Sequence, residues 1–346
     1  MRSITCATAA LLLTVGITSP AQADDYFAGK EITLYVGSSP GGPYDAYGRL
    51  LARHLGRHIP GHPGVVVQNM PGASGRRLMG FIYNVAPRDG TAIATAQRAL
   101  AFDPLMGVDS RFDPDKVNWI GSANNETNVC MVWHASPIRT LDDVKTHDMV
   151  VGTSGPSSTD AIYPNVMNYL FGTRFRVVGG YQAAAESNVA MERGEIDGRC
   201  GITWDTLVSL NADWLRDKKI RLLVQFALDR NRDLPDVPSV FDLAKTDEER
   251  QILALWAAPN KMGRPFFAPP DMVADRVDLL RRAFDAAMQD PEFLAETARM
   301  QLAVAGIAGE QVQALIRQVY ATPKDVVAKA ALAGRGRSSM PRAMGP

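Results

Sequence analysis

The feature that most constrains the fold is a repeated succession of a short apolar run, a loop of small residues and an amphipathic stretch. The first run, at 32–36, ends in a Gly/Ser/Pro segment, after which apolar side chains recur at helical spacing from about residue 45. Alternation of this kind is typical of α/β layers on largely parallel sheets. The predicted strands lie at 32–36, 65–69, 92–95, 129–133, 149–151, 175–178, 199–202 and 221–226.

The length of the chain predicts two lobes, because 346 residues exceed what one hydrophobic core usually serves. The first lobe is expected to comprise residues 24–122 plus 226–333, and the second lobe residues 123–225. Residues 334–346 begin Gly-Arg-Gly-Arg-Ser-Ser, and this composition predicts a disordered tail. Ligands of open α/β sheets bind beyond the carboxyl ends of the strands, so we expect a binding cleft between the lobes.

The N-terminus predicts export. Arg2 supplies a positive start, and residues 7–17 form an apolar stretch too short to span a bilayer. Ala21-Gln22-Ala23 offers the small-x-small pattern at which signal peptides are cleaved. Residues 1–23 are therefore predicted to be a signal peptide and the mature chain to be periplasmic.

The charge balance argues against nucleic acid as a partner. Lys plus Arg number 37 and Asp plus Glu number 37, which gives a formal net charge of +0. A chain without net charge has no long-range field for nucleic acid or an anionic membrane. Any anion must then be held by local dipoles or by a few fixed charges.

Cysteine and histidine usage predicts neither a metal nor a cofactor. Cys130 and Cys200 both lie in predicted strands, where they either form a disulfide in an oxidising compartment or stay free and buried. His54, His58 and His62 are spaced by four, but prolines interrupt the helix before His62, so a solvated helix end is expected.

Two loops of small residues are the predicted anion sites. The first loop, residues 37–45, reads Gly-Ser-Ser-Pro-Gly-Gly-Pro-Tyr-Asp, and the second loop, residues 154–159, reads Ser-Gly-Pro-Ser-Ser-Thr. Each opens a helix, whose free N–H groups and dipole favour an anion. Facing each other, they are expected to bind a carboxylate. The alternative is an ordinary strand-to-helix turn, with Asp45 as a first-turn capping carboxylate.

Other candidates end the remaining strands. Gln97 and Arg98 follow the third strand, although Arg98 is also compatible with a solvated position, and Trp204 with a place in the core. Residues 71–77 lack the Gly-Lys-Ser/Thr ending of a phosphate loop. The predicted ligand-binding residues are Ser38, Ser39, Gly41, Gly42, Tyr44, Asp45, Gly72, Ala73, Gln97, Arg98, Ser154, Gly155, Ser157, Ser158, Thr159, Tyr181, Trp204 and Asp205.

Several motifs in order along the chain resemble one family. They are Pro-Gly-Gly-Pro-Tyr-Asp at 40–45, a valine-rich strand with Asn-Met-Pro-Gly-Ala-Ser-Gly at 65–75, Ala-Pro-Arg-Asp-Gly-Thr at 86–91, Gly-Glu-Ile-Asp at 194–197 and Leu-Pro-Asp-Val-Pro-Ser at 234–239. In these motifs the chain resembles the tripartite tricarboxylate transporter receptor family, also called the Bug family. The chain departs from the family at Pro43-Tyr44, which replaces a pair of small residues.

The resemblance implies a periplasmic-binding-protein fold of the Venus-flytrap kind, with crossing strands expected near 118–123 and 222–226. It implies a small carboxylate ligand, held by residues matching 39–45, 72–73 and 154–159. It also implies delivery to one large and one small integral membrane transporter subunit by a monomeric receptor without catalytic activity.

Two alternatives stay open from the sequence. One is a receptor that presents its ligand to a membrane-bound sensor kinase. The other is an exported enzyme acting on a carboxylate, against which the chain has neither G-x-S-x-G nor H-E-x-x-H.

Overall fold

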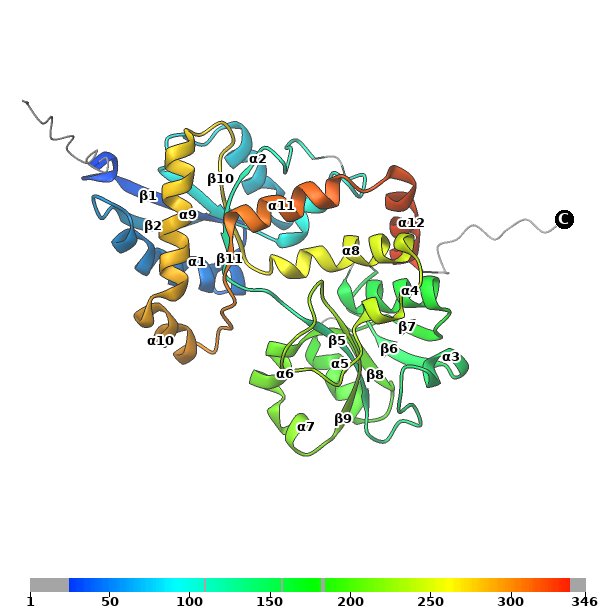
Figure 1. The fold of residues 1–346 in the computed structure, drawn as a ribbon. Helices are drawn as coiled ribbons and strands as arrows, with labels where there is room; N and C mark the ends of the chain where they lie inside the picture. The colour runs from blue at the N-terminus through cyan, green and yellow to red at the C-terminus, as the bar shows by residue number, and fades with distance from the viewer. Residues whose placement is uncertain (1–24, 109, 157, 182–183, 337–346) are drawn as a thin grey trace, which may run out of the picture.

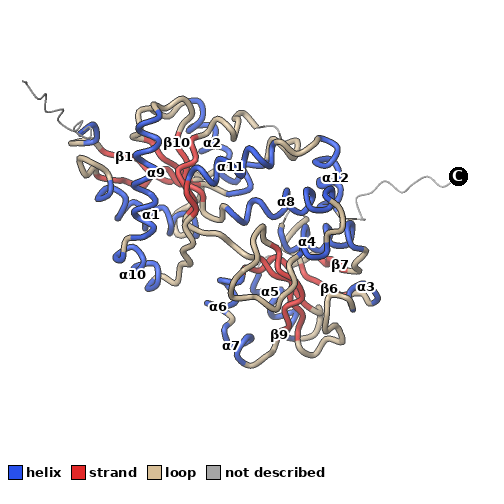
Figure 2. Tube along the Cα trace, viewed as in Figure 1, coloured by secondary structure: helices blue, strands red, loops and turns tan. Residues whose placement is uncertain are grey.

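The computed structural model describes residues 25–108, 110–156, 158–181 and 184–336. The chain forms two lobes, each built on its own β-sheet with helices packed around it (Figures 1 and 2). The predicted two-lobed α/β fold is confirmed. The predicted signal peptide lies outside the described residues, as does the predicted tail from residue 337.

The first sheet has the strand order β11-β4-β10-β3-β1-β2. β1 pairs in parallel with β2 and β3, whereas β10 runs antiparallel to β3 and β4. Its strands are β1 (Glu31–Val36), β2 (Gly64–Asn69), β3 (Ala92–Thr95), β4 (Asn118–Ser122), β10 (Pro265–Ala268) and β11 (Ile307–Ala308). Its helices are α1 (Pro43–Leu55), α2 (Arg76–Asn84), α9 (Ala274–Gln289), α10 (Pro291–Arg299) and α11 (Gly309–Tyr320).

The second sheet has the order β7-β6-β8-β5-β9, with β6 parallel to β7 and β8, and β5 antiparallel to β8 and β9. Its strands are β5 (Asn128–Trp133), β6 (Met149–Gly152), β7 (Phe175–Val178), β8 (Gly198–Thr203) and β9 (Ile220–Phe226). Its helices are α3 (Asp143–Thr146), α4 (Thr159–Phe171), α5 (Ala184–Glu192), α6 (Trp204–Leu210) and α7 (Ala212–Arg216).

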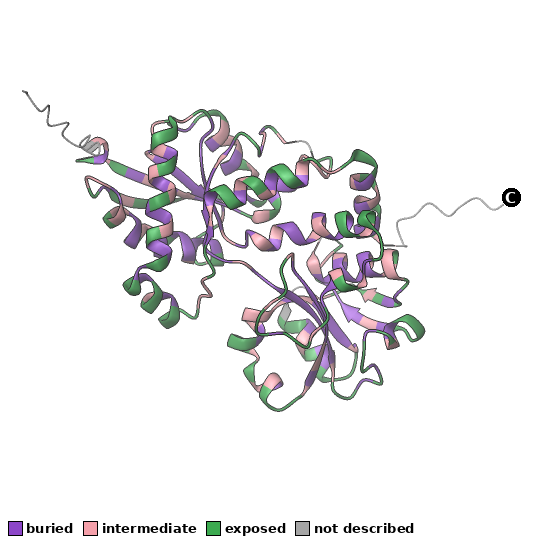
Figure 3. Cartoon of the chain, viewed as in Figure 1, coloured by how far each residue is buried: buried purple, intermediate pink, exposed green. Residues whose placement is uncertain are grey.

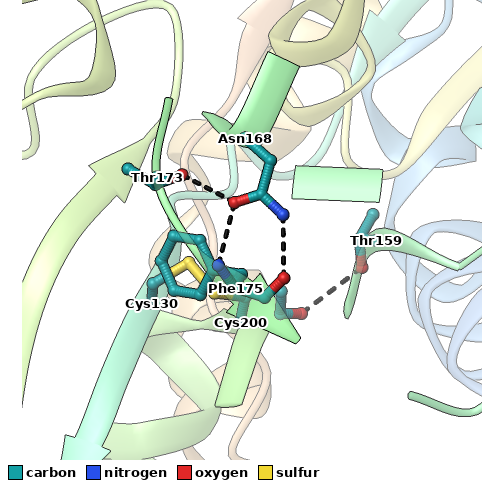
Figure 4. The surroundings of a disulfide bond; sticks show 7 residues. Cys130, Thr159, Asn168, Thr173, Phe175 and Cys200 are labelled. Atoms are coloured by element: carbon teal, nitrogen blue, oxygen red, sulfur yellow. Dashed lines mark hydrogen bonds between the residues drawn. A yellow bond between two sulfur atoms is a disulfide. The ribbon is translucent and has the colours of Figure 1, made fainter. Parts of the chain in front are cut away.

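A disulfide joins Cys130 of β5 to Cys200 of β8 inside the second sheet, so the first of the two sequence alternatives holds. Both cysteines are buried. Figure 4 shows Asn168 of α4 nearby, donating to the Phe175 carbonyl at 2.8 Å and accepting from the Phe175 amide at 2.9 Å. The disulfide and this side chain tie three strands and a helix of the second lobe together.

The lobes are joined by two crossing segments that pair with each other. Residues 123–127 lead from β4 to β5, and the chain returns at 262–264, after α8 (Asp247–Lys261). Their backbones bond twice, from Gly263 N to Asn124 O and from Ala123 N to Arg264 O, both at 2.9 Å. The predicted crossing at 222–226 is wrong, because those residues pair with β5 as part of β9.

The last helix forms a further connection between the lobes. At the end of α11 the Tyr320 hydroxyl donates to the Ala101 carbonyl in the first lobe at 2.9 Å. After residues 321–323, α12 (Lys324–Arg335) packs on α4 and α8, where its Gly334 carbonyl accepts from Asn165 Nδ2 at 3.2 Å. Residues 334 and 335 are thus helical, although the sequence assigns them to the tail.

Burial follows the layers, with buried strands and with helices exposed on their outer faces (Figure 3). In β1, for example, Ile32, Leu34 and Val36 alternate with more exposed residues, as expected of a strand with one face against a helix layer. Among the helices of the described residues, none has both the length and the apolar character needed to span a bilayer.

Candidate functional site

Three loops of the first lobe meet where the parallel strands β3, β1 and β2 end. A Cβ atom on Gly37 would lie 2.9 Å from Ala96 Cβ and 3.3 Å from Gly75 Cα, so these three backbones touch. The Arg98 amide donates to the Tyr44 hydroxyl at 3.1 Å. The structure therefore brings the first loop, the Gly72-Ala73 segment and Gln97-Arg98 to one edge of the sheet.

The carboxylate of Asp45 stabilises the conformation of the first loop through hydrogen bonds. Its carboxylate accepts from Gly41 N at 2.8 Å, Asn69 Nδ2 at 2.8 Å and Arg49 Nε at 2.9 Å, and it is 3% exposed. Although burial acts to raise it, these hydrogen bonds hold the pKa of Asp45 below its usual range. Its oxygens are engaged by donors of the chain itself, which fits the capping alternative rather than ligand contact.

Asp160, in the first turn of α4, has the same role at the second loop. Its carboxylate accepts from Thr153 Oγ1 at 2.5 Å, from Ser154 N at 3.1 Å and Ser154 Oγ at 3.0 Å, and also from the Ser158 hydroxyl. The sequence interpretation missed Asp160. The available signal was an acidic residue just after a small-residue loop, as at Asp45.

Several amides expected to bind an anion are already paired. Gly41 N donates to Asp45 and Ser154 N to Asp160, while Gly155 N donates to Thr153 Oγ1 at 3.0 Å and Ser158 N to the Gly155 carbonyl at 3.2 Å. Binding of a carboxylate by these amides stays a prediction, and it would require each amide to exchange its partner in the chain for the ligand. Ser157 lies outside the described residues.

The crossing segments hold a buried cluster of charges that the sequence interpretation only partly anticipated. Glu126 is 3% exposed and accepts from two arginines, with Arg264 Nη1 at 2.7 Å from Oε1 and Arg98 bonded to Oε2. The Arg264 guanidinium also lies 5.0 Å from the centre of the Tyr44 ring. Two guanidinium groups thus share one carboxylate between the lobes. Arg98 was predicted, and Glu126 and Arg264 were missed.

Asp205 reaches the same cluster from the second lobe. Burial raises the pKa of Asp205, although a hydrogen bond from Asn124 and the positive charge of Arg264 act in the opposite direction. The Tyr47 hydroxyl lies close to the charges of Arg264 and Asp205, and burial raises the pKa of Tyr47 to about 12. The preceding residue, Trp204, is half-buried and donates its amide to the Thr127 carbonyl at 2.8 Å. Predicted residues of both lobes therefore converge on the crossing segments.

The second loop also borders a cavity between the lobes. A cavity of about 470 Å³ is lined by Arg76 and Ala99 of the first lobe, by Pro156 of the second loop, and by side chains of α8 and α12. A neighbouring cavity of about 390 Å³, lined by residues 153–156, shares Pro156 with it. In the first lobe, the larger cavity is bordered by residues next to the Gly72-Ala73 and Gln97-Arg98 segments rather than by the first loop.

Tyr181 takes a different position. A Cβ atom on Gly152 would lie 2.9 Å from its ring, so the tyrosine packs over the end of β6. It lines a surface hollow of about 360 Å³ together with Val189 and Arg193 of the α5 region. That hollow contains none of the residues of the crossing cluster.

The histidines form structural contacts. His54 is 4% exposed, and its Nε2 lies 2.7 Å from Glu296 Oε2 of α10, so the expected solvated position is wrong for this residue. The helix α10 packs over α1 and covers it. In the part of the chain that the structure describes, no three His, Cys, Asp or Glu side chains are grouped so as to hold a metal ion.

Comparison with protein families gives a match over most of the chain. The family described as tripartite tricarboxylate transporter family receptor matches residues 49–332. A UPF0065 protein of Bordetella bronchiseptica is 23% identical over 282 residues, which is 80% of this chain and 78% of that protein. The predicted resemblance is thereby confirmed.

Solved structures share the fold. A TctC solute-binding protein from Polaromonas has a TM-score of 0.70 and 20% identity, covering 87% of this chain and 98% of that one. MatC of Rhodopseudomonas palustris, with bound malate, has a TM-score of 0.55 and 18% identity, covering 86% and 99%. An R. palustris protein with adipate has a TM-score of 0.57 and 16% identity, covering 87% and 97%.

Proposed function

The chain belongs to the tripartite tricarboxylate transporter receptor family, and from that premise we propose that it is a periplasmic receptor that captures an organic carboxylate and delivers it to a membrane transporter. The observation that carries the proposal is the pair Arg98 and Arg264 on the single carboxylate of Glu126. The family consists of solute-binding receptors, so no catalytic role is assigned to the cluster.

The charge arithmetic at the crossing segments favours an anionic ligand. Two guanidinium groups share the single carboxylate of Glu126 in a mostly buried place, so their remaining donors suit a second carboxylate. Asp205 also approaches Arg264 from the second lobe, and a ligand carboxylate would bind beside it. Guanidinium groups suit this task because their planar donors match the two oxygens of a carboxylate.

The solved neighbours support the same class of ligand. MatC holds malate and the other R. palustris protein holds adipate, and both ligands are organic dicarboxylates. A micromolar dissociation constant corresponds to only about 8 kcal/mol, which a few charge-assisted hydrogen bonds and lobe closure are able to supply.

In this proposal the receptor works by closure about the paired crossing segments. A carboxylate that touches Arg98, Arg264 and the second lobe together stabilises the closed arrangement over the open one. One large and one small membrane subunit then recognise the closed receptor, which acts as a monomer. The first crossing segment agrees with the lobe boundary predicted at residue 123, whereas the return at 262–264 lies after the boundary predicted at residue 226.

A thermal-shift screen tests the proposal on the chain from Asp24 onward. Mono-, di- and tricarboxylates are added to the protein, and a ligand present at 100 times its dissociation constant stabilises the native state by about 2.7 kcal/mol. We expect a rise in melting temperature of about 5 °C for at least one series. In Arg264→Met the rise should vanish, whereas Arg317→Met, at an exposed arginine on α11, should keep it. Absence of any shift for the unchanged protein would refute a carboxylate receptor.

A further inference from the structure

The cavity of about 470 Å³ between the lobes has an apolar wall that takes no part in the proposed binding of a carboxylate group. Its volume lies within the range of about 300–1,000 Å³ typical of sites for small organic molecules. The wall is formed by Phe102 and Met106 from the first lobe, Ile162 from the second, and Leu255 and Trp256 from α8. Apolar side chains from both lobes therefore line one shared cavity.

This wall offers few free hydrogen-bonding groups. The indole N–H of Trp256 donates to the Ala330 carbonyl of α12 at 3.0 Å, so its ring presents only apolar surface. Arg76 is bound to Asp103 by an ion pair of 2.7 Å at the cavity lining. The ionic side chains of the lining therefore include a pair that is already formed, and most of the surface that remains is apolar.

The cavity adjoins the polar residues of the candidate site on both sides. Ala99 directly follows Arg98, whose side chain takes part in the cluster with Glu126. Pro156 lies in the second loop and borders both the apolar cavity and the smaller one lined by residues 153–156. A molecule with a charged head and an apolar body would therefore find both kinds of surface side by side.

The cavity is also bounded by elements of both lobes. The wall combines first-lobe residues with α12, which packs on α4 of the second lobe. Figure 1 shows α4, α8 and α12 close together, on the side of the molecule away from α1 and α10. An apolar body in this space would contact both lobes at once and so favour closure, as the carboxylate does at the cluster.

We infer, resting on the proposed carboxylate receptor function, that the ligand is a carboxylate with an aliphatic or aromatic body, which the cavity between η4 (Arg98–Phe102), α4, α8 and α12 encloses. A short, strongly hydroxylated acid would leave the apolar wall exposed to water. Each methylene moved from water into the cavity should lower the dissociation constant about three- to fourfold.

Titration calorimetry with two homologous series tests this inference. Propanoate, hexanoate and octanoate form one series, and succinate, adipate and suberate form the other. We expect the dissociation constant to fall by the stated factor per methylene until the cavity is filled, and the heat-capacity change of binding to become more negative with chain length.

Two variants place the effect in the cavity. Ala99→Trp puts a large side chain on its lining, and Val108→Asp puts a charge there, both at exposed residues. Each should weaken octanoate and suberate binding at least tenfold and change propanoate and succinate binding less than twofold. Ala298→Trp, at an exposed residue of α10, is the matched control and should alter neither series.

The outcomes separate the two proposals. Carboxylates that bind with affinities independent of chain length, unaffected by Ala99→Trp and Val108→Asp, overturn the apolar-body inference and leave the receptor function standing. If neither series binds to the unchanged protein, the receptor function fails for these acids and the inference falls with it.

Discussion

In the first loop Asp45 binds an amide, an asparagine side chain and a guanidinium, whereas at the second loop Asp160 binds hydroxyls and an amide. Both are acidic residues in the first turn of a helix, and their carboxylates hold the preceding loop against the start of that helix. The first is tied by an ion pair to Arg49, which is itself nearly half exposed. The second accepts hydroxyl hydrogen bonds from the buried Thr153 and the exposed Ser154, and the buried Arg199 adds a favourable charge interaction with it. The same backbone arrangement is thus stabilised by an exposed arginine in one lobe and by hydroxyl donors and a buried arginine in the other.

The lobes differ in covalent support as well. The second sheet contains the Cys130–Cys200 disulfide, and the residue after Cys200 accepts a hydrogen bond at 3.4 Å from Thr159 at the start of α4. The strands of the first sheet contain no cysteine, and the sheet is stabilised by strand pairing and by packing around Ile32, Leu34 and Phe266. The comparison teaches that the sheet beneath the second loop is cross-linked covalently, while the first loop is held by hydrogen bonds from Asn69 of β2 and Arg49 of α1.

Removing the disulfide should give the largest difference between the lobes. The bond closes a loop of 70 residues, for which chain entropy predicts a loss of about 4 kcal/mol in the double variant Cys130→Ala/Cys200→Ala. Hydrogen exchange should show lost protection in β5 and β8 and unchanged protection in β1 and β3. Equal losses in both sheets would show that the lobes unfold as one unit and would remove this part of the comparison.

Replacing the two aspartates should give the next largest effect. Asp160→Ala removes the shared acceptor of Thr153, Ser154 and Ser158 and should lower the unfolding free energy by about 3 kcal/mol. Asp45→Ala should lower it by about 2 kcal/mol, because water can solvate the freed Arg49. Urea denaturation measures both. Asp160→Asn and Asp45→Asn are the matched controls that keep the side-chain shape. A larger loss at Asp45 would contradict the assigned order.

Acidification should give the smallest effect, through Asp45 of the first loop. The folded-state pKa of Asp45 lies below that of an unfolded aspartate, near 3.9. Its contribution to stability is therefore complete above that pH and is lost as the pH falls through the lower folded value. The difference in unfolding free energy between the unchanged chain and Asp45→Asn should shrink over this acidic range. A difference that is constant from pH 6 to pH 2 would exclude the carboxylate as its source.

The sequence predicted the local elements well, because they depend on local patterns. The valine-rich run at 65–69 became β2 (Gly64–Asn69), and the small-residue loops stand at the carboxyl ends of β1 and β6. Their glycines and first-turn acids are visible in the sequence. Which amides are free is not visible, because that depends on hydrogen bonds formed after folding.

The charged cluster could not be predicted from local patterns. Glu126 and Arg264 are 138 positions apart and meet only because the two crossing segments pair. His54 similarly gained its partner Glu296 from a helix 242 positions away. Apolar periodicity indicates which faces are buried, but it does not indicate which charges will share the same buried place.

The link between α11 and α12 limits how far the receptor can open. Tyr320 is anchored on the first lobe and α12 on the second, so only residues 321–323 separate two fixed ends. Three residues of extended backbone span at most about 11 Å. This short link therefore limits the separation of the lobes. Any wider opening would require α12 to detach from α4 or the end of α11 to unfold.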